Sequence, residues 1–233
     1  MSGLLAYTSD AKTKKGVAYG VLTGILYLVP DDTLCPMART AKCAEGCLVS
    51  AGRGAFTSVQ KGRARKTALY YANPVAFVDM LAIDIKKGMR KAARDGLTLA
   101  IRLNGTSDVA WEHKRGSNGL TLFEQFPDVQ FYDYTKLPGR KTPANYHLTV
   151  SYSGANPAYA AKAMASRHNV AVVFRTKELP AMFNGRRVIN GDITDLRFYD
   201  ERGVVVGLYA KGKAKKDTSG FVVDNNIIAR VAA

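Results

Sequence analysis

The stretch YHLTVSYSGANPAYAAKAMASRHNVAVVF, residues 146–174, decides the fold. Its apolar runs predict strands over residues 146–152 and 170–174, and the alanine-rich segment between them predicts a helix over residues 156–168. The dipeptide Asn156-Pro157 marks the helix start, because asparagine caps helices well and proline suits the first helical position. A strand, a helix and a strand joined by connections of a few residues are typical of a parallel sheet.

The same rhythm extends toward the N-terminus. The clearest helix is predicted over residues 74–95, since Asn73 can cap it, basic residues fill its last turns and Gly96 follows it. Other strands and one short helix are predicted from apolar runs at residues 21–29, 97–103, 120–126 (the helix) and 129–134. No Gly-x-Gly-x-x-Gly sequence follows a strand, which favours a barrel over a dinucleotide-binding sheet. We therefore expect an α/β fold, a partial (β/α) barrel of mostly parallel strands.

The end of the chain has a different pattern. Residues 193–199 and 204–210 flank the turn sequence Asp200-Glu-Arg-Gly203, which predicts a C-terminal β-hairpin. The chain contains neither an internal repeat nor a long linker. We therefore expect a single α/β domain over residues 1–233, divided into a barrel-like body and a hairpin with a tail, at residues 17–190 and 191–233.

Charge and hydropathy narrow the partners and the compartment. The net charge is +15, from 34 Lys and Arg against 19 Asp and Glu, and a field of that sign attracts nucleic acids or nucleotides. No apolar run is long enough to cross a membrane, and the first residues lack the features of a signal peptide. We expect a cytoplasmic protein with no membrane partner. The sequence does not specify the oligomeric state.

The three cysteines of the chain, Cys35, Cys43 and Cys47, lie within thirteen residues. Thiolates favour zinc, copper(I) or iron–sulfur clusters, and three of them leave one coordination position open. We predict that these cysteines bind a metal or a cluster. Zinc would need a fourth ligand from His113, a carboxylate or water. The competing interpretation is three small buried residues without a metal. A nucleophilic cysteine is disfavoured, because no histidine lies nearby in the sequence.

Polar side chains follow most of the predicted strands. In α/β barrels, reactive groups collect beyond the carboxyl ends of the strands. We therefore expect a cofactor pocket facing the open coordination position, lined by Arg102, Asn104, Asp108, Tyr134, Lys136, Ser151 and Arg175. A separate group of acids, Asp192, Asp195 and Asp200, suits a divalent ion, but turn-forming aspartates and an ion pair between Asp195 and Arg197 explain most of this pattern.

The cysteine loop after the first strand resembles that of the radical S-adenosylmethionine barrel enzymes. The match is one of layout, because seven residues separate Cys35 from Cys43 and three separate Cys43 from Cys47, whereas that superfamily uses Cys-x-x-x-Cys-x-x-Cys. The chain more closely resembles phage proteins of the gene-product-eighty-eight type, which look like reduced versions of that barrel. The corresponding pieces are Cys35-Pro36, the two later cysteines and Arg102-Leu-Asn-Gly-Thr-Ser-Asp108, within residues 21–175. The resemblance implies a [4Fe–4S] cluster and no particular reaction.

Two functions follow from these observations. The first is a phage-encoded iron–sulfur protein with one open iron, acting in the host cytoplasm, with S-adenosylmethionine as a candidate second cofactor and a nucleotide or nucleic acid as a candidate substrate. Whether it is an enzyme of the radical S-adenosylmethionine kind stays open. The alternative is a basic, non-catalytic nucleic-acid-binding phage protein with a structural zinc or no metal at the cysteine loop.

Overall fold

A computed structural model describes residues 3–7, 15–43 and 52–224 of the chain. Its centre is a nine-stranded sheet in the order β1-β2-β3-β4-β5-β6-β9-β8-β7. The strands are β1 (Leu5–Ala6), β2 (Val21–Leu26), β3 (Thr98–Arg102), β4 (Gln130–Thr135), β5 (Tyr146–Ser151), β6 (Asn169–Phe174), β7 (Met182–Phe183), β8 (Arg186–Asn190) and β9 (Val205–Tyr209).

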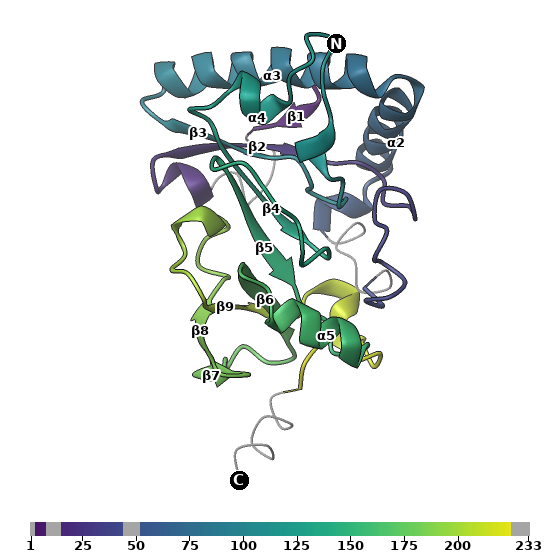
Figure 1. Cartoon of the computed structure of the whole chain (residues 1–233), viewed down its shortest axis with the longest axis vertical. Coiled ribbons are helices and arrows are strands. Elements are labelled where there is room, and N and C mark those ends of the chain that lie inside the picture. Colours follow the sequence, from purple (N-terminus) through teal and green to yellow (C-terminus); the bar gives the residue numbers. More distant parts are fainter. Residues whose placement is uncertain (1–2, 8–14, 44–51, 225–233) are drawn as a thin grey trace.

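Helices lie in the connections β2–β3, β3–β4, β5–β6 and β8–β9. The α-helices are α2 (Thr57–Ala72), α3 (Pro74–Arg94), α4 (Leu122–Gln125) and α5 (Pro157–Met164). Short 3₁₀ helices are η2 (Gly52–Ala55), η3 (Trp111–His113), η4 (Arg197–Tyr199) and η5 (Gly212–Lys216). Figure 1 shows α3 lying across the β1–β3 end of the sheet and α5 near its β6–β9 end. Within the described part of the chain, none of the helices combines the length and the apolar character needed to cross a bilayer.

The parallel sheet confirms the predicted fold class. Each strand from β2 to β5 pairs in parallel with the strand that follows it in the chain. Such stepwise addition is the winding of a (β/α) barrel, whereas a doubly wound sheet reverses direction. The sheet does not close, because antiparallel pairs with β1 and β7 occupy its two ends. The molecule is therefore a partial barrel.

Helix α3 forms where its sequence signals predict it. The Asn73 side chain accepts a hydrogen bond from the Ala76 amide at 3.0 Å, and Pro74 is the first helical residue. Gly96 follows the helix with a φ of +66°, a conformation that glycine adopts at little cost. The apolar side of α3, which includes Leu81 and Ile85, is buried in the large core cluster above the sheet.

The two faces of the sheet are covered differently. Alternate strand residues such as Ile101 and Phe131 join the core beneath α3 and α4, and Val170 and Val172 join a second core with α5. We call this side the helix face. On the other side, the inner face, residues 191–203 pack against β4 and β5 through η4. We call residues 191–203 the covering segment.

The predicted position of the C-terminal hairpin is wrong. Residues 193–199 form turns and the 3₁₀ helix η4, and β9 pairs in parallel with β6 and β8. The alternating polar residues Asp195 and Arg197 do not lie in a strand. They form ion pairs with Arg102 and Asp200, respectively. The hairpin in this part of the chain joins β7 to β8 through Asn184-Gly185, where both residues have positive φ, at +45° and +77°. Asn-Gly is the sequence signal for that turn.

Strand β9 also changes the expected division of the chain. It lies between β6 and β8, so residues beyond 190 contribute an interior strand to the sheet.

Candidate functional site

The first part of the cysteine loop lies against the end of β3. The Asp108 amide donates a hydrogen bond to the Leu34 carbonyl at 2.7 Å, and the Cys35 thiol faces the Thr106 carbonyl at 3.9 Å. Both partners belong to the segment that follows β3. Cys35 is half-buried. The sequence-based expectation that this loop would lie at the carboxyl ends of the parallel strands therefore agrees with these contacts.

The later part of the loop reaches the ends of β5 and β6. The Ser153 hydroxyl, just beyond β5, donates to the Ala41 carbonyl at 2.6 Å. Cys43 is half-buried between two apolar clusters, one containing Tyr159 and the other Phe221. The pKa of Tyr159 is raised, first by burial and then by Asp108 and Cys43. Cys47, the third predicted ligand, lies outside the described residues.

The three cysteines of the loop suit a soft metal or an iron–sulfur cluster, because thiolates are soft ligands. Within residues 3–7, 15–43 and 52–224, no three His, Cys, Asp or Glu side chains come together as metal ligands. A third thiolate for Cys35 and Cys43 would have to come from Cys47.

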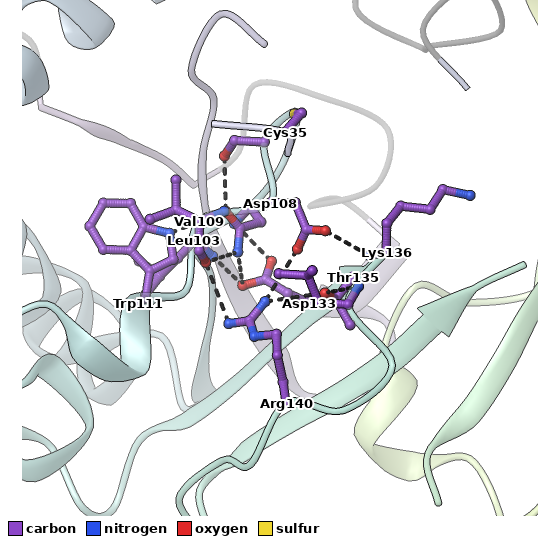
Figure 2. Close-up of polar contacts among 12 residues, drawn as sticks. Cys35, Leu103, Asp108, Val109, Trp111, Asp133, Thr135, Lys136 and Arg140 are labelled. Atoms are coloured by element: carbon purple, nitrogen blue, oxygen red, sulfur yellow. Dashed lines mark hydrogen bonds and ion pairs between the residues drawn. The ribbon is translucent and has the colours of Figure 1, made fainter. Parts of the chain in front are cut away.

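A buried polar network lies directly beneath Cys35 (Figure 2). We call it the Arg140 network, since the Arg140 guanidinium is its centre. Arg140 Nε donates to Glu112 Oε1 at 2.8 Å, its Nη2 binds the other Glu112 oxygen, and its Nη1 donates to Asp108 Oδ1 at 3.2 Å. The Thr135 hydroxyl accepts a further hydrogen bond from Nη1 at 3.3 Å. All three guanidinium nitrogens have partners, so the network is saturated.

Asp133 is the fully buried acid of this network. Its carboxylate accepts hydrogen bonds from the Asn104 amide at 2.8 Å and from the Tyr146 hydroxyl at 2.9 Å. Burial raises the pKa of Asp133 to about 7, although Arg102, these two donors and Arg140 oppose the shift. The pKa of this carboxyl group therefore lies well above that of an ordinary aspartate.

Asn104 shapes the loop after β3. Its side-chain oxygen accepts hydrogen bonds from Ser107 at 2.9 Å, from the Val109 amide at 2.9 Å and from the Trp111 indole at 3.2 Å. Its side-chain NH₂ group donates to the Val109 carbonyl at 3.0 Å. With its amide group used in this way, Asn104 fixes the loop against which Cys35 lies.

Lys136 and Ser151 meet at the same edge of the sheet. The Lys136 ammonium donates to the Ser151 and Tyr152 carbonyls, each at 3.0 Å, and lies 4.7 Å from the centre of the Phe221 ring. The main chain of Lys136 also joins the Arg140 network, because its amide donates to Asp108 at 2.7 Å. These contacts bring Asn104, Asp108, Lys136 and Ser151 together at the carboxyl ends of β3, β4 and β5.

Arg175 belongs to another part of the molecule. It binds Asp224 and donates to the Lys215 carbonyl at 3.0 Å and the Asp217 carbonyl at 2.7 Å. These interactions hold the segment that contains η5 and residues 217–224 against the end of β6. Its predicted part in a cofactor pocket stays a prediction.

Arg102 and Tyr134 point to the inner face. Arg102 Nη1 donates to Asp195 Oδ2 at 2.7 Å, and its guanidinium lies 4.9 Å from the centre of the Tyr134 ring. The Tyr134 hydroxyl is 3.5 Å from Asp195 Oδ1. The seven residues predicted to line one pocket are thus divided between the rim, the inner face and the C-terminal segment.

A family model matches residues 4–225, which is nearly the whole chain, and its description is Gene product 88. The chain belongs to the Gene product 88 family. This confirms the family to which the sequence pointed, and with it a phage protein. No curated protein and no solved structure gives a significant match.

A hollow of about 260 Å³ opens beside Cys35 in this Gene product 88 protein. Leu34 and Pro36 from the cysteine loop, and Asp108 and Ala110 from the segment after β3, contribute to its wall. Two of these residues flank Cys35 in the sequence.

The site of the Gene product 88 chain also contains residues that sequence reasoning missed. Arg140 follows a Pro-Gly turn and its partner Glu112 is 28 residues away, so no local signal marks the pair. Asp195 and Arg197 stand out in the sequence as an acid–base pair, but Asp195 binds Arg102 of β3 instead. Their partners become visible only when the covering segment lies on the inner face.

Proposed function

We propose that the protein is a phage iron–sulfur protein, in which Cys35, Cys43 and Cys47 hold a [4Fe–4S] cluster with one iron open to a small ligand. The observation that carries this proposal is the position of the cysteine loop across the carboxyl ends of β3 and β5. That edge is where parallel α/β folds bind ligands. Reducing conditions in a host cytoplasm would keep the three thiols available.

The neighbouring residues suit such a cluster. A cluster with three thiolate ligands carries negative charge. The Lys136 ammonium lies 4.7 Å from the centre of the Phe221 ring, and Cys43 packs against the apolar cluster that contains Phe221. The hollow of about 260 Å³ is lined by Leu34 and Pro36, the sequence neighbours of Cys35, and our candidate for a second cofactor near it is S-adenosylmethionine. Such a cofactor would supply radical chemistry, while the protein would orient the substrate and exclude water.

Anaerobic reconstitution with iron and sulfide tests the cluster. We expect a broad absorption near ~400 nm and about four irons per chain, with both lost in Cys35→Ser, Cys43→Ser and Cys47→Ser. Thr40→Ser is the matched control, because Thr40 is an exposed residue of the same loop. A folded protein that binds zinc, or no metal, under these conditions would contradict the proposal.

Adding S-adenosylmethionine to the reconstituted protein tests the open iron separately. A change in the electron paramagnetic resonance spectrum of the reduced cluster would support direct binding of the cofactor. An unchanged spectrum would leave the cluster in place and would refute this second cofactor.

A second function, nucleic-acid binding, is favoured by the distribution of charge on α2 and α3. Their exposed surfaces carry six basic residues, Lys61, Arg65, Lys86, Lys87, Arg90 and Arg94. A charged stripe of this kind can follow a phosphate backbone.

Charge reversal tests this surface. The triple variant Lys86→Glu, Lys87→Glu, Arg90→Glu should weaken salt-dependent binding to a DNA or RNA duplex by at least about tenfold. The control reverses three exposed lysines elsewhere: Lys162, Lys213 and Lys216. An equal loss in both variants would contradict a specific role for α2 and α3.

A further inference from the structure

Buried polar atoms gather where the covering segment meets the inner face. Six side-chain atoms here have no hydrogen-bond partner among the described residues: Thr23 Oγ1, Arg102 Nε, His147 Nε2, Thr149 Oγ1, Arg197 Nε and Arg197 Nη1. The four residues Thr23, Arg102, Thr149 and Arg197 are each at least 95% buried. Buried polar groups are normally paired, so this concentration calls for a ligand with complementary atoms.

The chemistry of these atoms defines the ligand. The Arg102 and Arg197 nitrogens are obligate donors, and the two threonine hydroxyls can donate. Two carboxylate oxygens lie near them: Asp200 Oδ2 is 3.2 Å from Arg197 Nη1, and Asp133 Oδ1 is 3.8 Å from Arg102 Nε. A region with this excess of donors and two guanidinium groups is complementary to a phosphoryl or carboxylate group.

The protein already places one carboxylate in this region. Asp195 of the covering segment binds Arg102 Nη1 at 2.7 Å and lies 3.5 Å from the Tyr134 hydroxyl. Both partners belong to neighbouring strands of the sheet, and Asp195 is the residue that brings the negative charge to them. Its interaction has the geometry expected of an external oxyanion.

The covering segment is attached mainly at its two ends. At the first, the Gly191 amide donates to the Gly207 carbonyl at 2.8 Å and Lys211 binds Asp192. At the second, the Val170 amide donates to the Val204 carbonyl at 3.2 Å. Among the described residues, the backbone hydrogen bonds of residues 193–200 stay within the segment. The middle is therefore held on the sheet by side chains, chiefly Asp195, Leu196 and Phe198.

We propose that the inner face of β3, β4 and β5 is an oxyanion-binding site, which Asp195 occupies in this structure and which a phosphoryl or carboxylate group of a ligand takes over when the covering segment moves away. Arg102 is the primary binding residue. Thr149 supplies a further donor from the sheet, while Arg197 moves away with the covering segment. The proposal does not depend on the cysteine loop, so loss of a cluster and loss of this site are separate results.

Removing the internal carboxylate tests the proposal. Asp195→Ala removes the closest partner of Arg102 and leaves Asp133, at 3.8 Å, as its remaining acidic partner among the described residues. Added inorganic phosphate or acetate should then raise the melting temperature, with an apparent Kd at least about tenfold below that of the wild-type chain. The double variant Asp195→Ala, Arg102→Gln should lose this response. Glu201→Gln, which changes an exposed acid of the same segment, should behave like wild type.

The two anions distinguish the sources of the oxyanion. A response to phosphate alone assigns a phosphoryl ligand, a response to acetate alone assigns a carboxylate ligand, and a response to both supports the shared site. Sodium chloride at equal ionic strength is the control. A folded Asp195→Ala that responds to neither anion, or equally to chloride, would overturn the proposal.

A second measurement applies even where Asp195→Ala does not fold. Asp195→Asn keeps the size of the side chain and removes the charge that holds the segment to Arg102. Amide hydrogen exchange across residues 193–200 should then be at least about tenfold faster than in the wild-type chain. Unchanged exchange would show that Asp195 does not hold the covering segment and would overturn the proposal.

Discussion

Two buried arginines, Arg140 and Arg102, differ in how many of their guanidinium nitrogens have hydrogen-bond partners. Arg140 uses every guanidinium nitrogen and binds two carboxylates, Glu112 and Asp108. Arg102 has one close ion pair, and its Nε has no hydrogen-bond partner among the described residues. The number of hydrogen bonds that each guanidinium makes therefore separates an arginine that stabilises the fold from one that can still bind a ligand. A saturated network fixes a loop, whereas an unsaturated one retains donors for a ligand.

Removing each arginine in turn should give the largest difference in unfolding free energy between the two regions. Arg140→Met leaves Glu112 and Asp108 buried without their cation and should cost about 3–5 kcal/mol of unfolding free energy. Arg102→Met should cost roughly half as much, because Asp195 belongs to a segment that can turn its carboxylate to solvent. Chemical denaturation measures both.

The control for these substitutions is Arg115→Met. Arg115 pairs with Glu124 at 3.0 Å on the surface, with about half of each side chain exposed, so its removal should cost no more than ~1 kcal/mol. If Arg140→Met and Arg115→Met were equally mild, the Arg140 network would not be the structural element inferred here.

The two regions should also respond to pH in opposite directions. Burial raises the pKa of Asp133 to about 7, so between about pH 4 and 7 the unfolded chain releases a proton that the native state keeps, and unfolding free energy falls as pH rises. Burial, with His168, Arg197 and Arg202, lowers the pKa of His147 to about 4. As the pH falls from about 6.5 to 4, His147 is protonated in the unfolded chain but stays neutral in the native state, so unfolding free energy falls as pH falls.

Two variants isolate these contributions. Relative to wild type, Asp133→Asn should remove the loss of unfolding free energy toward pH 7, and His147→Gln should remove the loss toward pH 4, each by roughly 3–4 kcal/mol. Denaturation curves at half-unit pH intervals give both slopes. Parallel pH profiles for wild type and Asp133→Asn would show that this carboxyl group does not titrate in the native state as described.

The smallest expected difference concerns one hydroxyl in each region. Tyr146→Phe removes a hydrogen bond of 2.9 Å to Asp133 and should cost about 1–2 kcal/mol. Tyr134→Phe removes a contact of 3.5 Å to Asp195 and should cost no more than ~0.5 kcal/mol. Thermal or chemical unfolding measures both, and a larger cost for Tyr134→Phe would reverse the comparison.

The sequence predicted what local signals determine. The β5-α5-β6 unit and α3 were found because an asparagine cap, a proline at the helix start and apolar runs agree in both, and a glycine also follows α3. Helix α2 was missed because its buried positions include Arg63 and Thr67, so its apolar residues do not recur at helical spacing. Residues 193–199 were assigned to a strand because Asp195, Arg197 and Tyr199 alternate in the sequence as strand residues do. In the structure, Asp195 is instead paired with Arg102 of β3.

The candidate site was predictable only in its position. The cysteine loop and the polar strand ends could be placed at one edge of the sheet, because parallel strands end there together. The sequence did not reveal whether the side chains of Arg102 and Tyr134 point to the helix face or to the inner face, because that depends on the strand register. Nor could it pair Arg140 with Glu112, which come together only through the folded loop.

The place of β9 in the sheet sets the order of assembly during synthesis. β9 lies between β6 and β8 and pairs with both. The ribosome therefore synthesises β8 before β9, which is the partner that joins β8 to the sheet. Until residue 209 emerges, the edge of β6 is an open template for pairing with another chain. The nascent protein therefore passes through a stage at which its sheet ends at β6, and the last strand protects that edge.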